Sequence, residues 1–153
     1  MKLCLFLDFD GVMHPQPYRG NAFCQLPLIE DVLREFPSVQ IVISSSWREH
    51  YDLMSLKRMF SEDISLCVIG TTKFYDPALN HLSNPVTTDF ERQREIELWM
   101  RENASPDAVW IAVDDYPKWF EPDCPNLLVT SAASGFVEHD KQSLRDMIRA
   151  RLI

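Results

Sequence analysis

Residues 3–10 read LCLFLDFD, a run of five apolar residues followed by two aspartates that flank a phenylalanine. An unbroken apolar run without alternation is typical of a strand that is buried on both faces, as in a parallel sheet. Asp8 and Asp10 therefore follow the carboxyl end of the first predicted strand. Ligands of open parallel sheets bind beyond that end of the strands, so these two acids are the first candidates for a functional site.

The rest of the chain alternates predicted strands with predicted helices. Apolar runs predict further strands at 39–43, 66–69, 108–113 and 127–129, with Gly70 ending the third strand. Apolar spacing predicts helices at 27–36, 47–60, 90–101 and 137–152, and residues 71–89 form a long irregular stretch. This alternation indicates a single α/β domain over residues 1–153, a Rossmann-like doubly wound parallel sheet with helices on both faces.

The composition is that of an acidic globular domain. Its 153 residues suffice for one hydrophobic core, and the formal net charge of −8 argues against broad, non-specific binding to nucleic acid but allows a local basic groove. No apolar run approaches the ~20 residues of a membrane span, so no membrane partner is expected. Residues 1–7 are too short for a signal peptide and lack a cleavage site, which predicts a cytoplasmic protein with reduced cysteines.

Polar groups follow three of the predicted strands. Asp8 and Asp10 follow the first, Ser44 the second, and Asp114 and Asp115 the fourth, so four acids and a hydroxyl should meet at one edge of the sheet. Carboxylates this close must share protons or bind a cation, and oxygen ligands favour Mg²⁺, which also takes a phosphate oxygen from a substrate. One aspartate is then placed for attack on the phosphate and another for protonating the leaving group.

The order of these groups resembles the haloacid dehalogenase (HAD) superfamily. The similarity rests on four motifs: Asp8-Phe9-Asp10-Gly11-Val12 after an apolar strand, Ser44 after Ile41-Val42-Ile43, Arg92 before Glu95-Ile96, and Ala112-Val113-Asp114-Asp115. The resemblance covers most of the chain, and the first and fourth motifs are specific together. It implies a phosphatase, a phosphoric monoester hydrolase, because members with an acid at the position of Asp10 are typically phosphatases or phosphomutases.

The resemblance also implies a role for each acid. Asp8 attacks phosphorus, and Asp10 protonates the leaving group and then activates the hydrolytic water. Mg²⁺ is held by the carboxylates of Asp8, Asp114 and Asp115 together with the carbonyl of Asp10. Ser44 is implied to hydrogen-bond a phosphoryl oxygen, with Ser45 as the alternative and Ser46 as the predicted helix cap. The basic residue that stabilises the transition state is chosen from Arg92, Arg94 and Lys73, of which Arg92 has the better position.

A narrower resemblance points to the small HAD domains of Swiss army knife RNA-repair proteins. It rests on residues 43–48 (ISSSWR), Arg92 with Glu95-Ile96 and Trp99, the pair Asp114-Asp115, and Thr130 with Ser134-Gly135-Phe136. There the domain is expected to remove phosphate from polynucleotide ends. The resemblance thus implies a phosphorylated substrate, the ends of RNA or DNA, and a place in nucleic acid repair. Ser45 and Arg48 are the candidate substrate-binding residues.

Short intervals between the motifs predict a fold with no sizeable cap domain. Residues 10–44 hold a loop and one predicted helix, and residues 44–92 hold a helix, a strand and a loop. An open site favours large substrates, whose flanking phosphates need a basic rim. The candidates for that rim are Arg19, Arg48, Lys73 and Lys118. A small-metabolite phosphatase and a non-catalytic HAD-fold binding or regulatory protein are the alternative functions.

Two neighbours of the motifs have a structural and a functional interpretation. His14 lies in the loop after the first motif, where it could touch substrate, but a loop histidine is typically exposed and exposure is expected here. Trp47 is expected to be a core residue rather than a surface for base stacking. Two rival readings of the acids fit less well. A calcium loop needs further acids, which residues 12–14 do not supply. A response-regulator receiver has its acidic pair early in the chain, whereas the Asp114-Asp115 pair comes late.

Overall fold

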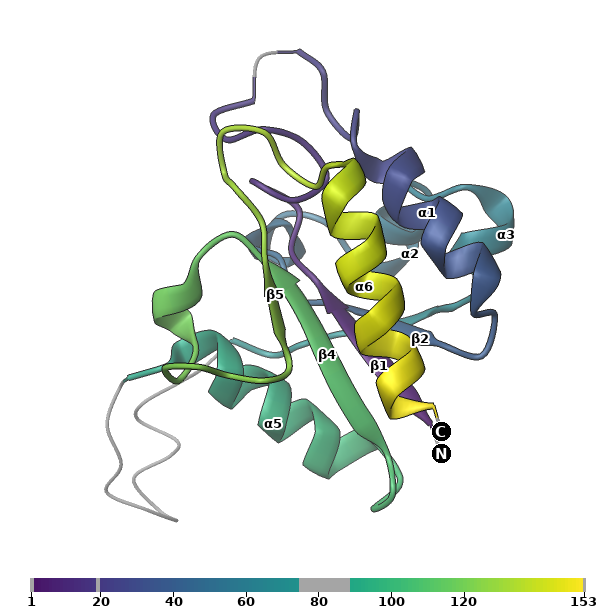
Figure 1. Cartoon of the computed structure of the whole chain (residues 1–153), viewed down its shortest axis with the longest axis vertical. Helices are drawn as coiled ribbons and strands as arrows, with labels where there is room; N and C mark the ends of the chain where they lie inside the picture. Colours follow the sequence, from purple (N-terminus) through teal and green to yellow (C-terminus); the bar gives the residue numbers. More distant parts are fainter. Residues whose placement is uncertain (1, 19, 75–88, 153) are drawn as a thin grey trace.

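The computed structural model describes residues 2–18, 20–74 and 89–152, and it contains an all-parallel sheet in the order β3-β2-β1-β4-β5 (Figure 1). The strands are β1 Leu3–Leu7, β2 Gln40–Ile43, β3 Val68–Thr71, β4 Val109–Asp114 and β5 Leu127–Val129. The strand order reverses at β1, which pairs with β2 on one side and with β4 on the other. Such a reversal opens a crevice at the carboxyl ends of the strands.

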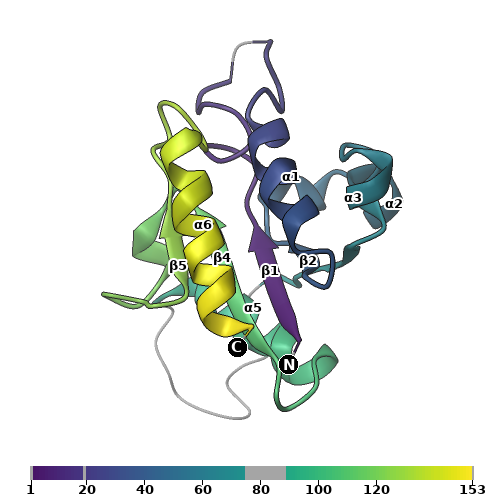
Figure 2. The ribbon, with the colours of Figure 1, turned by 45° about the vertical axis from the view of Figure 1, so that its right-hand side comes forward.

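Alternate residues of β1 face two separate hydrophobic cores. Leu3, Leu5 and Leu7 pack into the larger core, which lies under α1 (Leu26–Glu35) and α6 (Glu138–Arg151). Cys4 and Phe6 pack into the smaller core, which lies under α5 (Glu91–Asn103). In both views α1 and α6 lie side by side over one face of the sheet (Figure 1, Figure 2). The predicted doubly wound α/β fold is confirmed, and the described residues contain no large cap.

Local side chains mark the starts of α1 and α6. Pro27 lies in the first turn of α1, where its missing N–H costs nothing. The first turn of α6 is closed by Asp140, whose carboxylate accepts the N–H of Val137 at 2.8 Å. Among the described residues, no helix combines the length and the apolar character that crossing a membrane requires.

The single helix predicted for residues 47–60 is wrong. The chain instead forms a 3-10 helix, η1 (Ser46–Glu49), then α2 (Leu53–Lys57) and, beyond the predicted range, α3 (Glu62–Ser65). Two caps explain the breaks. Ser45 Oγ accepts the N–H of Trp47 at 3.3 Å, so Ser45 caps η1 in place of the predicted Ser46. Asp52 accepts the N–H of Ser55 at 2.8 Å and starts α2 as a new helix.

The third strand lies two residues later than predicted. Leu66 ends α3 and is 78% exposed, and the strand begins at Val68. Gly70 was predicted to end the strand but is part of it. A Cβ at this position would lie 3.4 Å from Trp99 Nε1, so the glycine allows the indole of α5 to pack against β3.

Candidate active site

The first motif leaves the sheet through a tight turn at the end of β1. The N–H of Asp8 donates to Val113 O at 3.1 Å, which keeps Asp8 in line with β4. The carboxylate of Asp8 accepts the N–H of Phe9 at 2.9 Å and is almost fully buried. Gly11 follows at φ +74°, and its carbonyl accepts the buried hydroxyl of Thr130 at 2.7 Å. The acids are therefore held by backbone geometry rather than by a flexible loop.

The second pair of acids leaves the neighbouring strand beside them. Asp114 is the last residue of β4, and its Oδ1 accepts the N–H of Tyr116 at 2.9 Å. Oxygens of Asp8, Asp114 and Asp115 all lie within 4.8 Å of one another. The structure thus brings together three of the acids that the sequence predicted to meet. The side chain of Asp10 points to other partners, described below.

Arg92 extends from the first turn of α5 into this acidic cluster. Its Nη1 lies 3.9 Å from Asp8 Oδ1 and 3.9 Å from Asp114 Oδ2, and its side chain is 6% exposed. The two other candidates for the basic residue lie elsewhere. Arg94 is paired with Glu97 and Glu121, and Lys73 is paired with Glu102. Of the three, the geometry favours Arg92 as the basic residue of the site.

Burial and mutual repulsion disfavour charge on two of the acids. The pKa of Asp8 is raised well above its usual range, first by burial and then by the neighbouring Asp114, while Arg92 opposes the rise. Burial also raises the pKa of Asp114 to about 6, and Arg92 and the N–H of Tyr116 limit that rise. Without further positive charge, the cluster holds protons that isolated carboxyls would release.

The site fits a divalent cation and a phosphate on its own chemistry. Asp114 Oδ2 and Arg92 Nη1 are buried, and neither has a hydrogen-bond partner in the part of the chain that the structure describes. A buried acceptor and a buried donor without partners are costly unless a ligand satisfies them. Three carboxylates suit Mg²⁺, and the guanidinium suits a phosphoryl oxygen. The predicted ligands Asp8, Asp114 and Asp115 are therefore placed to hold the cation.

Asp10 stands apart from the cluster, in a setting that the sequence analysis missed. Its Oδ1 lies 2.8 Å from His14 Nε2 and accepts the indole N–H of Trp47 at 3.1 Å. His14 is fully buried, so the prediction that it is exposed is wrong. Trp47 packs against the core as predicted, but its nitrogen faces the site. The sequence feature that could have predicted this contact is the spacing of the two residues. His14 follows Asp10 by four residues, and Gly11 allows the chain to turn between them.

The serine run after β2 and Arg48 form a buried connection to α5. The guanidinium of Arg48 donates to the carbonyls of Ser44 and Ser45 at 2.6 and 2.8 Å, and it pairs with Glu95 at 2.7 Å. The Arg48 side chain is 4% exposed, and the Ser45 hydroxyl already accepts the N–H of Trp47. These contacts place Ser45 and Arg48 behind the site and fix the end of β2 against α5.

An open pocket of about 190 Å³ joins these groups. The residues that line it are Asp8, Asp10, Gln16, Ser46, Arg92, Asp115, Tyr116 and Trp119. Sequence reasoning did not find Gln16, Tyr116 or Trp119, because loop side chains carry no periodic signal. Trp119 packs against Arg92, whose guanidinium carbon lies 4.8 Å from the ring centroid, and against Tyr116 at 4.8 Å between centroids. Two aromatic rings therefore stand beside the basic residue of the site.

The predicted basic rim is only partly present among the described residues. Lys118 is exposed next to Tyr116, and Lys73 is exposed but paired with Glu102. Arg48 is buried and paired, and Arg19 lies outside the described residues. Of the three described candidates, Lys118 is the one that is exposed and has no ion pair within the described part of the chain.

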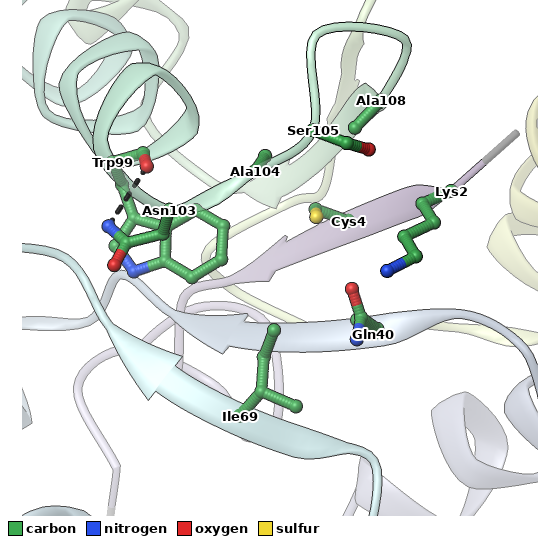
Figure 3. Close-up of a pocket in the computed structure, with 9 residues that line it drawn as sticks. All are labelled: Lys2, Cys4, Gln40, Ile69, Trp99, Asn103, Ala104, Ser105 and Ala108. Carbon is green, nitrogen blue, oxygen red and sulfur yellow. Dashed lines mark hydrogen bonds between the residues drawn. The ribbon is translucent and has the colours of Figure 1, made fainter.

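A second pocket lies at the opposite edge of the sheet, where the strands begin (Figure 3). Figure 3 shows Trp99 and Asn103 of α5 on one side and Lys2, Cys4 and Gln40 on the other. Burial raises the pKa of the Cys4 thiol, which keeps it protonated and unreactive. The pocket is lined by no acid and lies at the wrong end of the strands for ligand binding in this kind of sheet. The acidic cluster and Arg92 lie at the other edge.

Gly11 gives a sharp test of this arrangement. A Cβ at Gly11 would lie 2.3 Å from Asp115 Oδ2, so Gly11→Ala must displace that carboxylate. Mg²⁺ affinity is expected to fall about 10- to 100-fold, the usual cost of disturbing the support of a metal ligand, as measured by calorimetry. Gly20→Ala is the matched control, because Gly20 has a similar φ of +83° but open space around it. Equal Mg²⁺ affinity in both variants would contradict the assignment of Asp115.

Fold and site together define a HAD-type protein: a parallel α/β sheet with paired acids at the ends of two neighbouring strands and a basic residue between them. Comparison with protein families agrees. The family described as the HAD domain in Swiss Army Knife RNA repair proteins matches residues 4–140, and the chain belongs to this family. No curated protein and no solved structure matched the chain in the corresponding searches.

Proposed function

We propose that the protein is a Mg²⁺-dependent phosphomonoesterase that works through an aspartyl-phosphate on Asp8. The observation that carries this proposal is the acidic cluster with Arg92 in it. Three carboxylates have oxygens within 4.8 Å, and Arg92 Nη1 lies 3.9 Å from two of them. Family membership supports hydrolase chemistry of the HAD type. A non-catalytic binding protein has no need of such a cluster.

Each step of the proposed reaction uses a residue that lines the pocket. A carboxylate oxygen of Asp8 attacks phosphorus while the bond from phosphorus to the leaving oxygen breaks. Asp10 gives its proton to that oxygen. Water then attacks the phosphorus of the aspartyl-phosphate while the bond from phosphorus to the Asp8 oxygen breaks. Asp10 takes a proton from the water, and inorganic phosphate leaves with the Asp8 carboxylate restored. Arg92 binds the phosphoryl oxygens and stabilises the charge that they carry in both transition states.

Mg²⁺, when bound, supplies positive charge that keeps the acids ionised and neutralises the phosphate. Asp8, Asp114 and Asp115, with the carbonyl of Asp10, are the residues that would hold it. Arg48 has a supporting part in this proposal. Its guanidinium ties the end of β2 to Glu95, one helical turn from Arg92. Ser44 is buried at the end of β2 and is not among the residues that line the pocket, so its proposed contact with a phosphoryl oxygen rests on the family.

The proposed substrates are phosphorylated ends of RNA or DNA. Three features support this: the family, the open pocket and the aromatic rings beside it. Tyr116 is 43% exposed, and its ring meets Trp119 next to Arg92. A nucleobase stacked on an exposed aromatic ring gains about 1–3 kcal/mol without sequence preference. Tyr116 is therefore the proposed stacking surface for a base near the reacting phosphate, and Lys118 the contact to a flanking phosphate.

The test compares three substrates in Mg²⁺: a phosphorylated oligonucleotide, the matching mononucleotide and a sugar phosphate. We expect the highest kcat/KM on the oligonucleotide, by at least about 5-fold, the equivalent of one stacked base. Rising salt should lower that efficiency. Tyr116→Leu should remove most of the preference for nucleotides, whereas Leu66→Ala, at an exposed apolar residue that does not line the pocket, should not. Equal efficiency on all three substrates favours a small-metabolite phosphatase.

A further inference from the structure

Asp10 is the acid whose orientation the structure controls most closely. Two N–H donors converge on one of its oxygens, since His14 Nε2 and Trp47 Nε1 both contact Oδ1. In the described part of the chain no hydrogen bond reaches Oδ2. The Asp10 side chain is 31% exposed and lines the pocket, whereas the ring of His14 behind it is fully buried. The carboxyl group therefore has one bound oxygen and one free oxygen.

The backbone determines which nitrogen of His14 carries hydrogen. The N–H of Phe23 donates to His14 Nδ1 at 3.1 Å, so Nδ1 is an acceptor and Nε2 is the nitrogen that donates to Asp10. Phe23 adopts φ +60°, a left-handed conformation that is rare for a bulky residue. Strained backbone of this kind persists where the surrounding structure enforces it, often at functional sites. Here it directs an N–H toward the histidine.

Packing holds the second donor in place. The Trp47 indole contacts Phe9 and Phe23 edge to face, with centroids 5.7 and 5.3 Å apart, and stacks on Tyr51 at 5.5 Å. Ser45 caps the short helix η1 that carries Trp47. Neither His14 nor Trp47 has a place in the reaction steps proposed above. The hydrophobic packing of the fold does not need a buried histidine and an indole N–H on the same carboxylate oxygen, so these two contacts call for a functional explanation.

We propose that His14 and Trp47 are positioning residues that hold the carboxyl group of Asp10 so that Oδ2 exchanges protons with the substrate. This inference rests on the proposed phosphatase activity and names two more residues for it. An oxygen that already accepts two N–H donors has no free lone pair directed at the pocket, so transfer to the leaving oxygen runs through Oδ2. A proton donor that is already held in one orientation loses no conformational entropy when the transition state forms.

The test depends on the leaving group, because only a poor leaving group needs protonation. Trp47→Phe keeps an aromatic ring but removes the N–H, and His14→Leu removes the other donor. Each is expected to lower kcat/KM on a mononucleotide about 10-fold, the value of one hydrogen bond to a charged group. Each should change kcat/KM on p-nitrophenyl phosphate less than about 2-fold, because its leaving group needs little help. His14→Gln, which keeps an N–H donor, should recover part of the loss.

Controls separate positioning from a general loss of structure. Trp110→Phe alters a tryptophan that packs against Phe6, in the core away from Asp10, and should leave both substrates unaffected. Equal losses on the two substrates in Trp47→Phe and His14→Leu would overturn the proposal and leave the phosphatase activity standing. A wild-type protein that hydrolyses neither substrate in Mg²⁺ would refute the proposed function itself.

Discussion

Asp8→Asn is expected to abolish both turnover and phosphoenzyme formation. An amide is no nucleophile, so no aspartyl-phosphate can form at this position, which is buried beside Arg92 and Asp114. The measurement is the transfer of labelled phosphate to the protein, together with steady-state hydrolysis. Asp10→Asn is expected to slow hydrolysis of a mononucleotide about 10²–10⁴-fold, the range for loss of a general acid. It should still form phosphoenzyme from p-nitrophenyl phosphate.

A second comparison separates the nucleophile from the metal ligands, because Asp8 is proposed to be both. Asp115→Asn removes a carboxylate of the cluster but not the attacking oxygen. Asp115→Asn should lose activity mainly because it binds Mg²⁺ more weakly, so its activity should recover as the Mg²⁺ concentration is raised. Asp8→Asn should remain inactive at every Mg²⁺ concentration. Recovery of Asp8→Asn by excess metal would show that Asp8 is a ligand and that another group attacks.

Those parts of the site that follow directly from strand ends could be predicted from the sequence. An apolar run fixes where a strand stops, and parallel strands bring their carboxyl ends to one edge, so Asp8 and Asp114 had to meet. Arg92 could be placed only as one of three basic residues, because its direction depends on how α5 docks. The position of β3 depends on packing against Trp99, which the sequence does not show. The division of the predicted helix 47–60 into η1 and α2 depends on the caps Ser45 and Asp52.

The residues around Asp10 could not be predicted for a different reason. His14 lies in a loop, and its burial results from contacts with Phe23 and Trp47, which come from later parts of the chain. Tyr116 and Trp119 follow β4 in a short 3-10 segment, and only the folded structure shows that they meet Arg92. Arg48 has a partner that its position in the sequence does not reveal. A basic residue near the motif suggested a phosphate contact, but burial against Glu95 gives it an internal partner.

Removal of the metal with EDTA is expected to abolish turnover and to make the fold sensitive to pH. The pKa of Asp114 lies at about 6 in the folded protein, above the usual 3.8, so the folded protein holds this proton more tightly than the unfolded chain. The stability that this proton contributes is full below about pH 4 and is lost as the pH rises through about 6.

Asp114→Asn isolates this contribution, because an amide cannot ionise. In EDTA, urea unfolding should show the wild type losing stability relative to Asp114→Asn as the pH rises from about 4 to about 7. Mg²⁺ should restore the wild type at neutral pH and should stabilise the variant less, because the variant keeps only Asp8 and Asp115 as carboxylate ligands. A difference that stays flat with pH would contradict the buried acidic cluster. If full hydrolysis persisted in EDTA, the proposed metal-dependent mechanism would have to be abandoned. Among the described residues, Arg92 is the one basic group in ion-pair contact with this cluster, and a single guanidinium does not balance three carboxylates.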